Sequence, residues 1–252
     1  MTPSDIIAEL KKHPSCYYAT NRGVLLQGDS VSLLKGLRVQ SMDLILTDPP
    51  YGDNAGYGRE NKTIANNTTE KINYDIAEDL LRISKDDRSV YIFTNWKFEN
   101  KIREYYKKLG FNERMLICIV KNNFGMGHGF RNQHEFCIVL EKGKAKYNLN
   151  NFSNVIKMEH IQHNKDTHPH QKGETIIERM ILHSSNAGDI VLDPFLGSGS
   201  TGVLCERHGR YWVGIELDEK YCELGKNKIQ QEIDSGSLLT PPPAVEIQKN
   251  LF

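Results

Sequence analysis

The chain has 252 residues, and its 32 lysines and arginines balance its 32 aspartates and glutamates. This length suits one large α/β domain, and the zero net charge means that any nucleic-acid surface is local. Five scattered cysteines, none of them paired as Cys-x-x-Cys, argue against a disulfide framework and a zinc ribbon and favour a reducing compartment. We expect neither a signal peptide nor a membrane span.

Apolar runs of strand length alternate with helical patterns along the chain. Residues 1–20 hold a short helical pattern to which the sequence assigns no role. The expected strands are 23–27, 42–47, 89–94, 114–120, 135–140, 189–192 and 211–215. The expected helices with stated bounds are 75–84, 96–109, 174–183 and 219–233. Two further helices are expected, one after position 30 and one after position 202. This alternation predicts an α/β fold with a doubly wound, mainly parallel sheet.

Four segments lie outside this pattern. We expect a mobile loop at 52–74, a glycine-rich hairpin loop at 121–134, a short, weakly structured basic insertion at 142–167 and an extended tail at 235–252. The hairpin loop joins two buried strands, which predicts an antiparallel hairpin at one edge of the sheet. Residues 1–234 are then expected to form a single domain.

The apolar run 42–47 ends in Asp48-Pro49-Pro50-Tyr51. Proline fixes φ and has no N–H group, so the acceptors of Asp48 and Pro49 point outward with no neighbouring amide to satisfy them. A planar group with an amino substituent could stack on Tyr51 and donate to Asp48. On these four residues alone, a proline-stiffened turn explains the pattern equally well.

A second motif, Gly197-Ser198-Gly199-Ser200-Thr201-Gly202, follows the strand at 189–192 and precedes a helix. With Glu216 at the end of the next strand, this spacing fits a nucleotide-bearing cofactor whose ribose hydroxyls bond to the acid. A nicotinamide-dependent oxidoreductase is one interpretation. However, Asp193-Pro194-Phe195 precedes the first glycine, and an acid there repels a pyrophosphate and favours a cationic centre. S-adenosylmethionine, which has sulfonium and ammonium groups and no phosphate, fits this pattern better.

Acidic residues follow or end four of the expected strands. Because the carboxyl ends of parallel strands meet at one edge of a sheet, we expect these acids to line one crevice. They are Asp29, Asp48, Asp193 and Glu216.

With both motifs in view, residues 24–229 resemble the amino-methylating DNA methyltransferases, specifically the permuted β group in which the catalytic motif precedes the cofactor motif. The resemblance implies a Rossmann-like S-adenosylmethionine-dependent fold and direct, in-line methyl transfer to an exocyclic amine of a flipped base. It assigns catalysis to Asp48, Pro49, Pro50 and Tyr51. An Asp at the first motif position favours adenine N6, and cytosine N4 is the alternative, since serine is commoner there among the cytosine enzymes.

The same resemblance assigns the cofactor site. Asp29 looks like the family's adenine-side acid, and Glu216, followed by Leu217 and Asp218, looks like its ribose-binding acid. Lys172, in a segment similar to the family's His-Pro-x-Gln-Lys-Pro, corresponds to the cation that holds the cofactor's carboxylate, and Gly173 replaces the last proline. The other implied cofactor residues are Asp193, Pro194, Phe195, Gly197, Ser198, Gly199, Ser200 and Thr201.

We expect DNA to contact local basic surfaces near the end of the sheet that carries the site. Lys121 and Arg131 lie in the hairpin loop, and His134 lies in a segment that resembles one near the DNA and the target base in the family. Lys142 and Lys144 follow the second strand of the hairpin. Base recognition could be shared with the loop at 52–74 or with a second subunit.

The resemblance also implies a restriction-modification setting, with DNA as the partner and a homodimer and a cognate restriction endonuclease as further candidates. We expect a cytoplasmic, nucleoid-associated protein of bacterial or phage-like origin, with no membrane partner. His160, His163, His168 and His170 lie close together, but no cysteine or acid joins them at zinc spacing, so no metal is expected. A non-catalytic DNA-binding module is the remaining alternative, and the intact proline motif and zero net charge argue against it.

Overall fold

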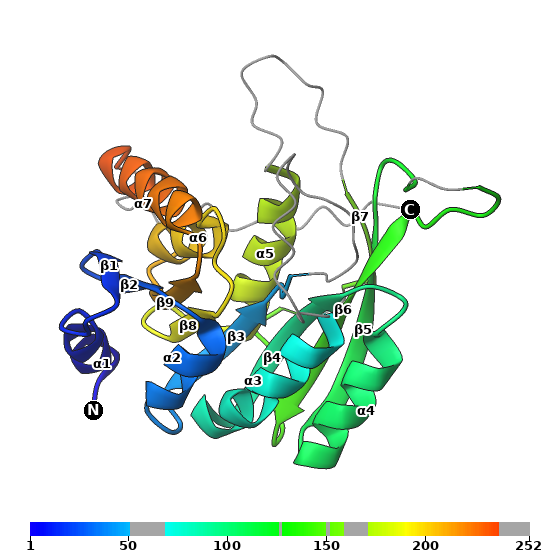
Figure 1. Cartoon of the computed structure of the whole chain (residues 1–252), viewed down its shortest axis with the longest axis horizontal. Helices are drawn as coiled ribbons and strands as arrows, with labels where there is room; N and C mark the ends of the chain where they lie inside the picture. The colour runs from blue at the N-terminus through cyan, green and yellow to red at the C-terminus, as the bar shows by residue number, and fades with distance from the viewer. Residues whose placement is uncertain (51–68, 126–127, 150–151, 159–170, 237–252) are drawn as a thin grey trace.

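The computed structural model describes residues 1–50, 69–125, 128–149, 152–158 and 171–236, with only the backbone described for residues 69 and 171–173. These residues form a nine-stranded sheet with helices on both faces (Figure 1). The strands are β1 (Cys16–Ala19), β2 (Gly23–Gln27), β3 (Met42–Thr47), β4 (Ser84–Thr94), β5 (Asn112–Val120), β6 (His134–Lys142), β7 (Val155–Lys157), β8 (Ile190–Asp193) and β9 (Tyr211–Glu216). The helices are α1 (Pro3–Leu10), α2 (Ser30–Gly36), α3 (Thr69–Ile83), α4 (Glu99–Leu109), α5 (Gln171–Ser184), α6 (Ser200–Arg207) and α7 (Glu219–Asp234).

The described strands lie in the order β1-β2-β9-β8-β3-β4-β6-β5-β7. Strands β2, β9, β8, β3 and β4 run parallel to one another, whereas β6 is antiparallel to both β4 and β5. The predicted mainly parallel sheet with an antiparallel hairpin is therefore confirmed. The hairpin is not the outermost element, because β7 pairs with β5 as a parallel edge strand, and β1 forms the other edge antiparallel to β2.

Strand β3 shows how the sheet is covered on both faces. All six of its residues are buried. Ile45 belongs to the core that packs against α1 to α4, and Leu44 and Leu46 belong to the core that packs against α5 to α7. This division follows from the alternation of side chains along a strand. Figure 1 shows the two sets of helices on opposite sides of the sheet.

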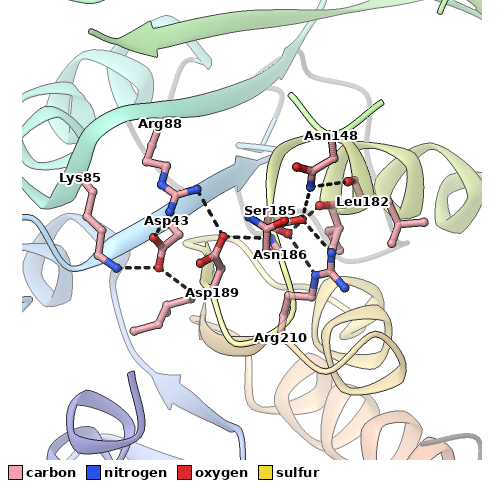
Figure 2. A network of polar contacts seen from close by, with 11 residues as sticks. Asp43, Lys85, Arg88, Asn148, Leu182, Ser185, Asn186, Asp189 and Arg210 are labelled. Carbon is pink, nitrogen blue, oxygen red and sulfur yellow. Dashed lines mark hydrogen bonds and ion pairs between the residues drawn. The ribbon is translucent and has the colours of Figure 1, made fainter. Parts of the chain in front are cut away.

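A charged network joins the amino ends of β3, β4 and β8 (Figure 2). Asp43 is only 1% exposed, and its carboxylate lies 2.7 Å from Lys85 Nζ and 2.9 Å from Arg88 Nη2. The Ile190 amide donates to Asp43 Oδ2 at 3.0 Å, and Arg88 also pairs with Asp189 at 3.3 Å. A buried carboxylate is tolerated when cations and amides satisfy it in this way. The network fixes β3 against β8, and both strands carry a sequence motif at their other end.

Some predicted boundaries are wrong. Helix α3 begins at Thr69, so residues 69–74 are not part of a loop; Ile72 and Ile76 are buried one turn apart, as in an amphipathic helix. Helix α4 begins at Glu99 rather than at position 96. The basic insertion also contains regular structure, because Lys142 ends β6 and residues 155–157 form β7.

The rest of the predicted loop (52–68), residues 159–170 of the insertion and adjoining segment, and the tail from position 237 lie outside the described residues. Of the helices that the structure describes, none combines the length and the apolar character needed to cross a membrane.

Candidate active site

The two sequence motifs come together because β3 and β8 are parallel neighbours. Ile45 pairs with Leu192, so both strands end at the same edge of the sheet. Asp48 follows β3 there, and residues 194–199, called the glycine loop below, follow β8. The sheet therefore places the proline motif beside the glycine loop although they are distant in sequence.

Strands β9 and β2 extend this edge on the other side of β8. Asp193 pairs with Gly214, and Glu216 pairs with Gln27. Asp29 follows β2 and begins α2 as its N-cap. All four acids therefore end or follow strands at the same edge of the sheet, and their lining of one crevice stays a prediction.

The pKa of Asp193 reflects its burial and the nearby acids. Burial raises the pKa of its carboxyl to about 7, hydrogen bonds from Thr201 and the Phe195 amide oppose that shift, and the charges of Asp48 and Glu216 add to it. Negative charges that act on the same buried acid make this edge attractive to a cation and unfavourable for a phosphate.

The first three residues of the proline motif directly follow the buried strand β3. Asp48 and Pro50 are exposed, whereas Pro49 between them is buried. The buried proline anchors this segment, and Asp48 lies exposed at the edge of the sheet. Tyr51, the predicted stacking partner of the base, lies outside the described residues.

Two threonines that the sequence analysis missed end the neighbouring strands β3 and β4. Thr47 and Thr94 are fully buried, and within the described part of the chain neither Oγ1 atom has a hydrogen-bond partner. By strand alternation they lie on the same face as Ile45 and Ile92. Buried hydroxyls are rarely left unpaired, so both are candidates to bind a ligand or its water. The sequence signal that could have identified Thr47 and Thr94 is a hydroxyl residue at the last position of two expected strands.

Asp193 organises the glycine loop from within. Its Oδ1 accepts from the Phe195 amide at 3.0 Å, and its Oδ2 accepts from Thr201 Oγ1 at 2.6 Å. The Ser30 hydroxyl donates to the Pro194 carbonyl and joins this loop to the end of β2. Both Asp193 oxygens therefore help to hold the loop in shape. The expectation that this acid also faces a cationic centre stays a prediction.

The glycines in this region permit close packing and a left-handed turn. Gly199 has φ of +89° and caps α6, and a Cβ there would lie 2.7 Å from Gly225 Cα on α7. Gly197 also has a positive φ, of +54°. Glycine adopts such values with no steric cost from a Cβ. Helix α6 therefore begins directly behind the loop, with its first amides directed toward it.

Glu216, the predicted ribose-binding acid, ends β9 at this edge. It is half-buried, and its Oε2 accepts from the Gly197 amide at 2.9 Å while its Oε1 accepts from the Asp218 amide at 2.8 Å. Each carboxylate oxygen has a second lone pair and can accept a further hydroxyl. Asp218 caps α7 by accepting from the Lys220 amide at 2.8 Å, and Leu217 between the two acids is exposed.

Asp29 has a structural role at the start of α2, and its role as the adenine-side acid stays a prediction. Its Oδ2 accepts from the Ser32 amide at 3.1 Å and from Ser32 Oγ at 2.8 Å, which caps α2. The exposed carboxylate is held in a fixed orientation at the end of β2. Asp29 thus stands on the same edge as Glu216.

The cations near the glycine loop differ in part from those expected. Lys172 lies in the first turn of α5, and the structure describes its backbone only. Lys228, which the sequence analysis did not select, donates from α7 to Ser198 Oγ at 3.2 Å. Lys228 follows Gly225 by three positions, so both lie on the face of α7 that meets the loop.

The residues at this edge suit S-adenosylmethionine by their chemistry. Asp29, Asp193 and Glu216 form no ion pair with a lysine or arginine in the described part of the chain. Such acids can accept from ribose hydroxyls and from an ammonium group and can stabilise a sulfonium, whereas a pyrophosphate would be repelled. In its described residues, this edge therefore lacks the chemistry that a dinucleotide site needs to bind a pyrophosphate.

The candidate DNA contacts divide into two groups. Lys121 follows the carboxyl end of β5, and Arg131 and His134 precede or begin β6, so these three lie on the side of the sheet that carries the site. Lys142 and Lys144 do not. Because β6 is antiparallel to β4, it carries them to the opposite edge.

At that opposite edge both lysines have structural partners. Lys142 Nζ lies 2.9 Å from the Ser84 carbonyl and 3.1 Å from Asp86, and the Lys144 amide donates to Asp87 at 2.8 Å. The prediction that Lys142 and Lys144 flank the site is therefore wrong.

Among the residues that the structure describes, no group of three or more histidine, cysteine or acidic side chains could hold a metal ion. The four histidines considered from the sequence lie within 159–170, outside these residues.

Similar proteins agree with this geometry. The type II methyltransferase M.HpaI of Haemophilus parainfluenzae is 30% identical over 236 residues, which cover 83% of this chain and 75% of the relative. The crystal structure of an M1.HpyAVI–SAM complex is 26% identical, with a TM-score of 0.61 over 81% of this chain and 98% of that chain. The cytosine-N4-specific PvuII DNA methyltransferase shares the fold at 16% identity, with a TM-score of 0.69 over 89% of this chain and 95% of that chain.

The fold and the site define an S-adenosylmethionine-dependent methyltransferase. The sequence model of the DNA methylase family, whose members modify N6 or N4 amines, matches residues 42–227, and the chain belongs to this family. The protein is a DNA methyltransferase that uses S-adenosylmethionine and acts on an exocyclic amine. The family match removes the nicotinamide-dependent oxidoreductase alternative.

Proposed function

We propose that the amine is adenine N6, that Asp48 holds it for methylation, and that the enzyme acts at a specific DNA sequence. The observation that carries the proposal is the exposed Asp48 at the end of β3, directly beside the glycine loop that follows β8. An Asp at this position is the residue that the family resemblance associates with adenine.

The chemistry of the amine explains why an acceptor is needed. The lone pair of an exocyclic amine is delocalised into the ring, so the nitrogen is a poor nucleophile. The Asp48 carboxylate and the Pro49 carbonyl would each accept one N–H and so favour a pyramidal nitrogen with an available lone pair. Positioning and electrostatic stabilisation then supply most of the acceleration.

The remaining residues prepare the methyl donor and the base. When bound, S-adenosylmethionine supplies a methyl group on an electrophilic sulfonium. Glu216 and Asp29 orient the adenosine end, and the glycine loop with Lys172 orients the amino-acid end. Tyr51 would stack on the flipped base, which returns about 1–3 kcal/mol toward the few kcal/mol that base flipping requires.

Expression in a methylation-free host, followed by sequencing of the genomic DNA for modified bases, tests this proposal. We expect N6-methyladenine in one sequence context, and none in cells that express Asp48→Ala. The variant should bind S-adenosylmethionine in calorimetry as the wild-type protein does, which separates lost chemistry from lost folding. N4-methylcytosine in place of N6-methyladenine would overturn the base assignment and leave the enzyme class intact.

Three features of the sequence analysis stay predictions: a homodimer, a cognate restriction endonuclease and association with the nucleoid. Sedimentation velocity of the purified protein with and without duplex DNA tests the first of them.

A further inference from the structure

The loop between β5 and β6 has an unusual composition for a surface loop. From Lys121 through His134 the sequence contains no acidic residue, and it holds Arg131, two histidines, two phenylalanines and Lys121, which pairs with Glu135 of β6. Cations, aromatic rings and amides without carboxylates suit a nucleic acid, which offers phosphates outside and flat bases inside. In Figure 1 this loop projects from the body of the molecule.

The base of the loop is held in shape by its own backbone. The Lys121 amide donates to the Gln133 carbonyl at 2.7 Å, and Gln133 Nε2 donates back to the Lys121 carbonyl at 2.9 Å. Farther along, the Gly125 amide donates to the Asn132 carbonyl at 2.8 Å. The two arms of the hairpin therefore continue beyond the sheet as far as Gly125 and Asn132, next to Phe130 and Arg131.

The two phenylalanines of the loop differ in what they contact. The Arg131 guanidinium stacks on the Phe124 ring, 3.8 Å from its centre, which orders both side chains. Arg131 forms no ion pair with a carboxylate in the described residues. Phe130 beside it is fully exposed. The loop thus holds an aromatic ring in solvent next to a cation whose charge is not neutralised.

The tip lies within reach of DNA bound at the site. Thr94 of β4 pairs with Phe136 of β6, so the loop leaves the sheet on the same side as Asp48. Strand β6 is two strands away from β3 and β5 is three, which at about 4.8 Å per strand corresponds to roughly 10–14 Å. That separation equals about three to four base pairs at about 3.4 Å each. A duplex whose axis runs across the strands and that presents one base to Asp48 would therefore pass over the hairpin loop.

We propose that Phe130 inserts into the base stack within about three to four base pairs of the flipped target, while Arg131 contacts a nearby phosphate. This inference rests on the proposed function, because it needs a base to leave the duplex. An apolar side chain inserted between bases offsets part of the unstacking, and an aromatic one stacks on the base that remains. The base stack then becomes the partner of the exposed Phe130 ring. A carboxylate in the loop would repel the DNA phosphates, which explains why the loop has none.

The test compares methyl transfer to two synthetic duplexes that carry the sequence identified by genomic sequencing. In one duplex the target base is correctly paired, and in the other it faces a mismatched base. For Phe130→Ala we expect kcat/KM on the paired duplex to fall about 10- to 100-fold, the loss that one stacking contact predicts. On the mismatched duplex, where the base leaves the stack easily, the variant should approach the wild-type rate.

Three outcomes would overturn the inference: an unchanged rate on the paired duplex, an equal loss on both duplexes, or an equal effect of the control Val39→Ala. Val39 is an exposed apolar residue that precedes β3 at the opposite edge of the sheet. Phe130→Trp should retain most of the activity, because it keeps an aromatic wedge. If the wild-type protein methylates neither duplex, the proposed function fails instead, and the two failures are distinguishable.

Discussion

The buried acid behind the site gives a testable dependence of stability on pH. Asp193 is 8% exposed, accepts from Thr201 and the Phe195 amide, and has its pKa raised from 3.8 to about 7 chiefly by burial. In the unfolded chain the same carboxyl ionises near its ordinary value. Between these two pKa values the folded protein binds one more proton than the unfolded chain does, so stability falls as the pH rises.

The magnitude follows from the two pKa values. The contribution of Asp193 is fully present below pH 3.8, is partly lost at pH 5 and is gone above pH 7. From pH 5 to pH 8 the free energy of unfolding should drop by about 3 kcal/mol through this group alone. Asp193→Asn has no proton to bind and should lack this component.

Urea denaturation of the wild-type protein and of Asp193→Asn at pH 5 and pH 8 measures the effect. The change between the two pH values should be more negative in the wild type by about 3 kcal/mol, and groups common to both proteins cancel in the comparison. Thr201→Val, which removes a hydrogen bond that favours the charged form, should move the midpoint of the loss to higher pH. Equal pH dependence in the wild type and Asp193→Asn would refute the reasoning.

Three further substitutions test other parts of the site. Asp48→Asn keeps the shape of the side chain but loses the charge, so methyl transfer should fall about 100- to 1000-fold with little change in S-adenosylmethionine affinity; comparable losses of both would contradict the assignment. Glu216→Gln should weaken S-adenosylmethionine binding in calorimetry about 10- to 100-fold, since a hydrogen bond to a charged acceptor contributes about 1.5–3 kcal/mol. Gly199→Ala should lower the free energy of unfolding by about 1–3 kcal/mol, because φ of +89° strains alanine and its Cβ would meet Gly225; an unchanged urea midpoint would show that α6 and α7 adjust freely.

Much of the fold was predictable because its signals are local. Strand β3 is mostly apolar apart from Asp43 and Thr47, the alternation of strands and helices indicates a mainly parallel sheet, and Gly110 ends α4 with φ of +112° as expected of a C-terminal glycine. The boundaries were less predictable. Residues 69–74 follow a stretch rich in glycine and asparagine, and their helical face became evident only from the packing of Ile72 against the core.

The candidate site divides in the same way. The proline motif, the glycine loop and Glu216 each lie in a short contiguous segment, so their chemistry is readable from the sequence. The roles of Lys142 and Lys228 depend on partners far along the chain: the first pairs with Asp86, and the second contacts Ser198. No local pattern contains that information.

The sequence by itself determined which groups are available: an acceptor platform, a glycine turn and acids at the strand ends. The tertiary structure decided where they meet. The pairing of β3 with β8 brings Asp48 next to the glycine loop, and the reversed direction of β6 moves Lys142 to the opposite edge while leaving Arg131 on the same side as the site. Burial, which also depends on the assembled sheet, turns Asp193 from an ordinary acid into one that titrates near neutral pH. Strand order, strand direction and desolvation are properties of contacts between distant segments, and a linear pattern does not specify them.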